Sequence, residues 1–175
     1  MIGFDSGYDK SKLSVFANWK GTEPFESGHK KEADFGELIK NIYTDVRPAT
    51  LREQLTHIDW ICSVGTIDVK AIKRISRHGD KEPDRIWVEF RHTKGGYGWL
   101  YGKQDFIAFE QNKYYVMVRR SDLAKLAEKL CDQNDYVTKA KDALYKVYNR
   151  KNTRDLISMI KITDLLSLQH RIIKK

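Results

Sequence analysis

Apolar residues recur along the chain with two periods, and the longer period predicts two helices. Within residues 29–43 they follow the i, i+3, i+4, i+7 spacing that puts side chains on one helix face: Phe35, Leu38, Ile39 and Ile42. A similar stripe marks residues 121–133, where Ser121 is of a type that favours the N-cap position. We therefore expect an amphipathic helix before the strands and another after most of them.

The shorter period, in which apolar and polar residues alternate, predicts strands in the middle of the chain. Three runs rich in Ile, Val, Trp and Phe cover about residues 57–63, 66–74 and 84–92. The first two surround a glycine and read as a hairpin. We expect the third strand to pair with the second.

Further strands follow a glycine-rich break at residues 93–104. The runs 105–111 and 113–120 are separated by a few polar residues around Asn112 and predict another hairpin. A last strand is expected at about 156–162, leading into a short terminal helix. This order predicts a mixed α/β domain of the α+β type, with a central mixed β-sheet flanked by helices.

Length and composition favour one domain. The chain has 175 residues, of which 41% are hydrophobic, and this is enough to bury one sizeable core. We expect a single domain over residues 1–175, with a core at about 30–130 and a basic C-terminal extension at about 131–175.

Charge and cysteine content narrow the classes of partner and compartment. The chain carries 32 Lys and Arg against 24 Asp and Glu, a formal charge of +8, which suits a polyanion such as nucleic acid. No run approaches the roughly 20 apolar residues of a membrane span, and the N-terminus lacks a leader pattern. Cys62 and Cys131 have no disulfide or zinc spacing. We expect a cytoplasmic protein with no membrane partner.

The first hairpin carries acids in positions where a strand usually has neutral residues. Asp68 and Lys70 share one face of the second strand, because side chains alternate across a strand. A two-residue turn at Ser63-Val64 would set Asp59 opposite Asp68, and a turn one residue later would set it opposite Lys70. Either register puts Asp59 on the face of the Asp68/Lys70 pair.

Two carboxylates on neighbouring strands of one sheet face repel each other, so a positive charge is expected to balance their negative charges. A hard divalent cation such as Mg²⁺ binds one or two carboxylates together with water and phosphate. A neighbouring lysine can position or deprotonate a water, or stabilise charge on a phosphate. Asp59, Asp68 and Lys70 are therefore the minimal parts of a phosphodiester-hydrolysing site. The alternative is a solvated face with a surface ion pair.

The first predicted helix supplies one more acid. At about 100° per residue, Glu32 falls beside the apolar edge formed by Phe35 and Ile39, so it can turn toward the sheet. Glu37 falls on the opposite side and should face water.

These parts, in this order, resemble the PD-(D/E)xK nuclease superfamily, which has the restriction-endonuclease-like fold. The resemblance covers roughly residues 30–130 and implies a Mg²⁺-dependent or Mn²⁺-dependent nuclease. It implies that Asp59 and Asp68 bind the metal and that Lys70 assists the attacking water. It also implies that Glu32 orients a metal-bound water.

The sequence departs from the family pattern at two points. Ile58 stands where the motif has proline, and Asp68 stands where glutamate is more usual. A literal Pro-Asp occurs at Pro83-Asp84, but it lies too close to Glu89 for a strand to turn and return. Glu89 can still flank the site; its alternative is a surface ion pair with Arg91.

Basic and aromatic residues beyond the hairpin are candidates for nucleic-acid contact. The groups that follow the second strand would bind phosphates: Lys73, Arg74 and Arg77. The glycine-rich break fails the spacing of a phosphate-binding loop. Its aromatic and polar residues could instead contact unpaired bases and phosphate: Tyr97, Trp99, Lys103 and, by analogy with the family, Gln104.

The sequence and the resemblance together predict a small metal-dependent DNA endonuclease of the kind found in phages, DNA repair or restriction. A structure-selective enzyme such as a Holliday-junction resolvase, acting as a homodimer, suits a short basic chain. RNA remains open as a substrate. The alternatives are a non-catalytic nucleic-acid-binding domain with a nuclease-like fold and a protein-interaction factor.

Overall fold

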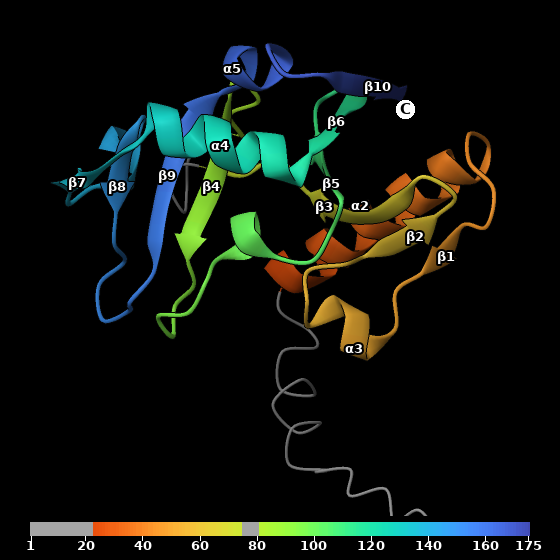
Figure 1. Ribbon diagram of the computed structural model, residues 1–175, viewed down its shortest axis with the longest axis horizontal. Helices are drawn as coiled ribbons and strands as arrows, with labels where there is room; N and C mark the ends of the chain where they lie inside the picture. Colours follow the sequence, from red (N-terminus) through yellow and green to blue (C-terminus); the bar gives the residue numbers. More distant parts are fainter. Residues whose placement is uncertain (1–22, 75–80) are drawn as a thin grey trace, which may run out of the picture.

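The computed structural model describes residues 23–74 and 81–175, and it contains two mixed β-sheets with helices (Figure 1). The six-stranded sheet has the order β1-β2-β3-β5-β6-β10. Its strands are β1 (Arg47–Pro48), β2 (Trp60–Cys62), β3 (Gly65–Lys70), β5 (Phe106–Glu110), β6 (Tyr114–Arg119) and β10 (His170–Lys174). Neighbouring strands are antiparallel except β3 and β5, which run parallel.

The second sheet has four strands in the order β4-β9-β8-β7. They are β4 (Arg85–Arg91), β9 (Leu156–Lys161), β8 (Lys146–Tyr148) and β7 (Asp132–Val137). In Figure 1 this sheet lies at the left, beside the six-stranded sheet.

Helices and short turns connect the strands. The helices are α2 (Glu23–Lys40), α3 (Leu51–Gln54), α4 (Arg120–Leu130) and α5 (Ile162–Leu166), and the 3₁₀ turns are η1 (Trp99–Tyr101) and η2 (Ala140–Asp142). In the part of the chain that the structure describes, no helix is long and apolar enough to cross a membrane.

Two hydrophobic clusters cover opposite faces of the six-stranded sheet. On one face, Phe35 and Ile39 of α2 pack against β3, β6 and β10, and both side chains are fully buried. On the other face, residues of β5 and β6 share a larger cluster with β4, β9 and α4. The second face of the sheet is therefore turned toward the second sheet.

The local features of the sequence are confirmed in this fold. It is mixed α/β, and β2–β3 and β5–β6 are hairpins. Of the predicted stripe, Phe35, Leu38 and Ile39 lie on the packed face of α2, whereas Ile42 lies beyond the end of the helix at Lys40 and is 53% exposed. The helix expected at 121–133 is α4, although Arg119, not Ser121, occupies its N-cap.

The pairing of the third strand was predicted wrongly. β4 does not pair with β3; it pairs with β9 in the second sheet, and β3 pairs with β5 instead. The reason is burial: the even positions of β4 contribute Ile86, Val88 and Phe90 to the cluster between the sheets. The sequence predicted one central sheet, and the structure has two.

The C-terminal part of the chain belongs to both sheets. Residues 131–175 contribute β7, β8 and β9 to the second sheet and β10 to the first. The short terminal helix was placed correctly after the strand at 156–161, but the chain then ends in β10, which pairs with β6. This segment is thus part of the core and not an addition to it.

Candidate active site

The β2–β3 hairpin fixes the relation between its two acids. The strands are joined by the two-residue loop Ser63-Val64, and Trp60 pairs with Ile67. This register sets Asp59 across from Asp68, which is the first of the two arrangements that the sequence allowed.

Gly65 makes this tight connection possible. Its φ of 131° lies in the region that side chains rarely adopt, and a Cβ there would lie 2.6 Å from Oδ2 of Asp105. That same Oδ2 accepts hydrogen bonds of 2.9 Å from the backbone N–H and the hydroxyl of Thr66. The hairpin is therefore held against the residue that precedes β5.

Asp59 is attached to β3 on both sides of Asp68. Its backbone N–H donates to the carbonyl of Ile67 at 2.9 Å, and its Oδ2 accepts from the backbone N–H of Val69 at 2.7 Å. Backbone pairing therefore holds the two carboxylates side by side, although their negative charges repel each other.

Asp68 is bound by Lys70 two residues later on the same face. Asp68 is 2% exposed, and Nζ of Lys70 donates to its Oδ1 at 2.8 Å. Nζ also lies 2.7 Å from Oδ2, but Oδ2 is buried and receives no well-aligned hydrogen bond from the described residues. A buried carboxylate oxygen with spare acceptor capacity is what a cation would find here.

The electrostatics follow from burial and from the shortage of positive charge. Burial and the neighbouring Asp68 raise the pKa of Asp59 from the usual 3.8 to about 7. Burial also raises the pKa of Asp68, although Lys70 opposes this. Burial alone would lower the pKa of Lys70, but Asp68 and Asp59 outweigh it and raise that pKa. Lys70 is therefore a firmly protonated cation beside two acids.

The site lies on the sheet face that is turned toward the second sheet. In the parallel β3–β5 pairing, Asp68 is beside Ile107 and Lys70 is beside Phe109. Ile107 and Phe109 belong to the cluster shared with β4 and β9. The acids therefore line the junction between the sheets, where β4 can contribute.

Glu89 is the contribution of β4. Its charge acts on Lys70, and its Oε2 accepts from the backbone N–H of Trp99 at 3.4 Å. Burial raises the pKa of Glu89, and this outweighs the Trp99 N–H and Lys70. Gly98 permits this contact, because a Cβ there would lie 2.2 Å from the Glu89 carbonyl oxygen. Glu89 thus flanks the site, as one of the two interpretations of the sequence proposed.

Glu32 approaches from α2, on the opposite face. Its side chain is partly buried, and its charge contributes to raising the pKa of Asp68. The indole of Trp60 donates to the Glu32 carbonyl at 2.9 Å and so fixes this turn of α2 against the hairpin. Glu37 is exposed, as its position on the helix predicted.

His57 lies near the acids without adding charge. Burial, together with Lys70 and His92, lowers the pKa of His57 to about 4. His57 is therefore neutral near neutral pH and leaves the excess of negative charge uncompensated.

The residues present fit a magnesium-type ion better than a closed metal centre. Among the described residues, no three His, Cys, Asp or Glu side chains gather into a metal-binding group. Mg²⁺ usually takes only one or two protein carboxylates and completes its shell with water and substrate phosphate. Asp59 and Asp68 meet that requirement, and the free acceptor capacity of Asp68 Oδ2 suits it.

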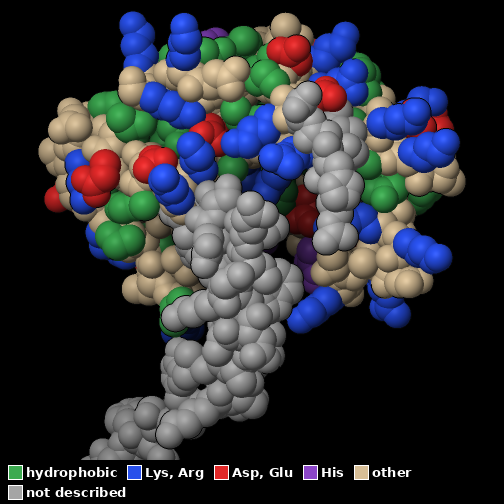
Figure 2. Space-filling view, turned by 180° about the vertical axis from the view of Figure 1, so that it is seen from behind, with side chains coloured by type: hydrophobic (Ala, Val, Ile, Leu, Met, Phe, Trp, Pro, Cys, Tyr) green, Lys and Arg blue, Asp and Glu red, His purple; other side chains and the backbone are tan. Residues whose placement is uncertain are grey.

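Most of the predicted nucleic-acid contacts are at the surface. Lys73, Arg74, Tyr97 and Lys103 are exposed, whereas Arg77 lies outside the described residues. On the face shown in Figure 2, Lys and Arg side chains are widely spread, with a group near the centre. A phosphate backbone could approach this face favourably.

Two of the predicted contacts do not fit their positions. Trp99 is 8% exposed and packs on Phe109, with ring centroids 6.2 Å apart, so it cannot offer a face to a base. Gln104 is 1% exposed, and its amide donates to the Trp99 carbonyl at 2.7 Å. The glycine-rich break folds inward at η1, which alternation alone did not reveal.

Glu110 is a buried acid that the sequence interpretation missed. It lies at the end of β5 and forms ion pairs with Lys31 at 2.9 Å and Lys175 at 2.8 Å. It also accepts from the backbone N–H of Ile72 at 3.3 Å. These partners outweigh burial and lower the pKa of Glu110. The position of Glu110 at the end of a buried strand was its only signal in the sequence.

No protein-family model matches this chain, and neither a curated protein nor a solved structure is significantly similar to it. The function is therefore inferred from the chemistry of these residues alone.

Proposed function

We propose that the protein is a divalent-metal-dependent nuclease that hydrolyses phosphodiester bonds in DNA, with a site of the restriction-endonuclease type. The observation that carries this proposal is the buried Asp68 beside the partly buried Asp59, with one lysine next to them. Two acids and one cation leave an excess of negative charge that a hard cation would balance. The formal charge of +8 favours the approach of a polyanion.

Each residue has a role in this proposal. Asp59 and Asp68 would hold Mg²⁺ or Mn²⁺, which when bound supplies a Lewis acid for the phosphate and a more acidic water. Lys70 keeps its proton, so it stabilises negative charge that develops on the phosphate and does not act as a base. Glu32 would orient the attacking water, since its charge acts on Asp68 although α2 covers the opposite face of the sheet.

The preferred DNA is branched or otherwise locally unpaired. The two sheets of the described residues share one hydrophobic cluster, and the exposed basic residues suit contacts to the phosphate backbone, which carry no sequence information. Two copies of the chain would be required to cut both strands of a junction, so a homodimer is part of the proposal.

Cleavage of a substrate panel tests this function. Plasmid, linear duplex, single strand, four-way junction and RNA are incubated with Mg²⁺, Mn²⁺ or EDTA. The proteins are the wild type, Lys70→Met and the control Lys125→Met, whose lysine is exposed on α4. We expect metal-dependent cutting that Lys70→Met reduces by about 100-fold or more and that the control retains.

Two results would count against the nuclease. Cutting that persists in EDTA, or that Lys70→Met leaves unchanged, contradicts the proposed roles. Tight nucleic-acid binding without cutting of any substrate would favour the non-catalytic binding domain instead.

A further inference from the structure

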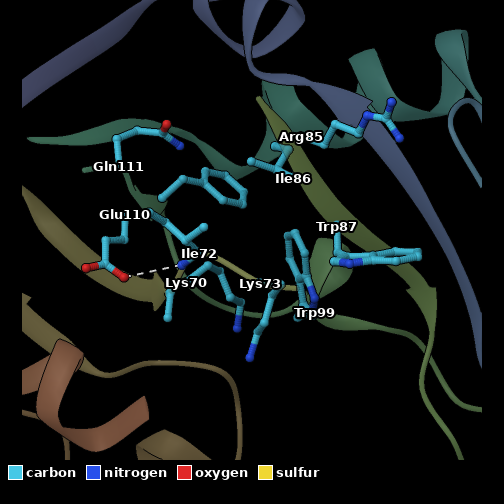
Figure 3. Close-up of a pocket in the computed structure, with 11 residues that line it drawn as sticks. Lys70, Ile72, Lys73, Arg85, Ile86, Trp87, Trp99, Glu110 and Gln111 are labelled. Atoms are coloured by element: carbon cyan, nitrogen blue, oxygen red, sulfur yellow. Dashed lines mark hydrogen bonds between the residues drawn. The ribbon is translucent and has the colours of Figure 1, made fainter. Parts of the chain in front are cut away.

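The cavity that Lys70 lines is too small for a nucleobase. Its volume is about 60 Å³, which gives room for roughly two waters. Figure 3 draws the residues around it, including Trp99, whose ring centroid lies 5.2 Å from Nζ of Lys70. An unpaired base of the substrate would have to bind elsewhere, and the segment that carries Trp99 also lines a larger cleft.

The larger cleft lies at the end of β4, and the starts of β7 and β9 also line it. Its volume is about 320 Å³, within the range of roughly 300–1,000 Å³ that is usual for small-molecule sites. The buried Phe90 and Leu156 supply apolar surface. The remaining side chains that line the cleft are aromatic, amide or basic: Arg91, Tyr97, Tyr101 and Gln133. No acid is among the described residues that line it.

Tyr97 presents to this cleft an aromatic ring that the fold barely uses. The residue is 82% exposed, although its turn is fixed to β4 by a 3.0 Å hydrogen bond from the Gly98 N–H to the Phe90 carbonyl. Its ring meets the ring of Tyr101 edge to face, with centroids 5.6 Å apart. Such a contact occupies at most one face of the Tyr97 ring. The other face is available to a planar ligand.

Tyr101 and Gln133 form the inner side of the cleft. The Tyr101 hydroxyl donates to Oε1 of Glu128 on α4 at 2.8 Å, and its ring packs against the cluster between the sheets. Gln133 is partly buried, and its side-chain amide makes no hydrogen bond with the described residues. An amide offers both a donor and an acceptor, which suits the polar edge of a base.

Three exposed basic side chains at the cleft have no ion-pair partner among the described residues: Arg91, Lys94 and Arg154. Arg154 comes from the segment before β9, and its backbone N–H donates to the Thr93 carbonyl at 3.0 Å. Its side chain lies over Gly95, where a Cβ would be 3.2 Å from the Arg154 Cδ. These cations suit the phosphates on either side of a bound base.

We propose that this cleft binds one unpaired nucleobase, which stacks on Tyr97 and turns its polar edge toward Gln133. The neighbouring phosphates contact Arg91 and Arg154. A base in a duplex is paired and stacked on both sides, so it cannot enter, and the site selects single-stranded or branched DNA. The inference deepens the proposed function, and it rests on that function for the position of the scissile phosphate beside Lys70.

Binding in EDTA tests the base site without cleavage. Fluorescence anisotropy is measured with labelled single-stranded DNA and with blunt duplex, for the wild type, Tyr97→Ala and Tyr97→Phe. The matched control is Tyr136→Ala, which removes a 61% exposed aromatic residue of β7 that does not line the cleft. We expect Tyr97→Ala to weaken single-strand binding about tenfold and to leave duplex binding unchanged. Tyr97→Phe and the control should retain most of the affinity.

The salt dependence of single-strand binding tests the phosphate contacts. Loss of one contact should reduce the slope of log affinity against log salt by about 0.7, so we expect this change in Arg91→Gln. Arg52→Gln, which removes an exposed arginine from α3, should leave the slope unchanged. Equal slopes for Arg91→Gln and the wild type would overturn the phosphate contact of Arg91.

Photo-crosslinking of the wild-type chain does not depend on the folding of a variant. A single-stranded oligonucleotide containing 5-iodouracil forms an adduct with an aromatic ring on which the base stacks. Trypsin cleaves after Lys94 and Lys103, so we expect the adduct in the peptide of residues 95–103, at Tyr97. Adducts only at other residues, or no single-strand binding by the wild type, would overturn the inference. Equal losses of single-strand and duplex affinity in Tyr97→Ala would also overturn it.

The outcomes separate this inference from the nuclease. Tyr97-dependent single-strand binding without cutting of any substrate would support the base site and remove the nuclease. Metal-dependent cutting, with a single-strand affinity that Tyr97→Ala leaves unchanged, would keep the nuclease and remove the base site.

Discussion

Oδ2 of Asp59 accepts a hydrogen bond from the backbone N–H of Val69 at 2.7 Å, and this contact holds Asp59 beside Asp68. The hairpin register thus forces two acids together in a partly buried place. Like charges on neighbouring strands destabilise a sheet. A destabilising pair of like charges is typical of functional sites, where residues with perturbed pKa values are often found.

The raised pKa of Asp59 predicts a pH-dependent site. Asp59 has a pKa of about 7, and a proton on its carboxyl competes with a cation. We expect cleavage to rise by up to tenfold per pH unit below about pH 7 and to level off above it. A rate profile across this range, at fixed Mg²⁺, checks the expectation. A profile that falls through pH 7 would mean that the protonated form is the active one.

The same pKa predicts that Asp59→Asn stabilises the fold. The folded pKa is raised from 3.8 to about 7, so ionisation costs folding energy that grows between these values and stays constant above them. At about 1.4 kcal/mol per pKa unit, we expect a gain of up to about 4 kcal/mol at alkaline pH and almost none in acid. Urea denaturation of Asp59→Asn and of Asp84→Asn, an exposed control, measures this. Equal stability of the two variants would refute it.

The ionised Glu110 should stabilise the fold, whereas the ionised Asp59 destabilises it. Its pKa is lowered by Lys175 and Lys31, so its contribution is present above the usual glutamate pKa and is lost as the pH falls through the lowered value. Glu110→Gln removes one member of a buried ion-pair group and should cost roughly 3 kcal/mol near neutral pH. The control Glu37→Gln, which alters an exposed pair with Lys40, should change little. Similar effects of both substitutions would contradict this assignment.

Gly36 sets the distance between α2 and the hairpin. A Cβ at this position would lie 1.9 Å from Cζ2 of Trp60, whose indole is held by the Glu32 carbonyl. Gly36→Ala should therefore destabilise by about 1–3 kcal/mol, although alanine normally favours a helix. Ala33→Gly, on the exposed side of α2, should cost about 1 kcal/mol through helix propensity alone. Thermal unfolding distinguishes them; a stabilised Gly36→Ala would show that α2 does not approach Trp60 so closely.

Local patterns in the sequence predicted those parts of the fold that depend on neighbours along the chain. Phe35 and Ile39 identified the apolar face of α2, and the alternation around Gly65 identified the hairpin that brings Asp59, Asp68 and Lys70 to one face. The turn position, which the sequence left open, was decided by the Ser63-Val64 loop.

Long-range pairing could not be predicted in the same way. The apolar face of β4, including Val88, could be buried against any apolar surface. The residues near β4 in the sequence therefore did not indicate that it pairs with β9. The same limitation affected individual side chains. Trp99 is buried because β4 and β5 enclose η1.

The claim that Asp59 and Asp68 hold a cation is tested most directly by calorimetric titration with Mn²⁺ at a pH of about 8. The proteins are the wild type, the double variant Asp59→Asn/Asp68→Asn and the control Asp84→Asn, each shown to be folded by circular dichroism. The account predicts binding to the wild type and the control and none to the double variant. Undiminished binding in the double variant, or none in the wild type, would contradict it.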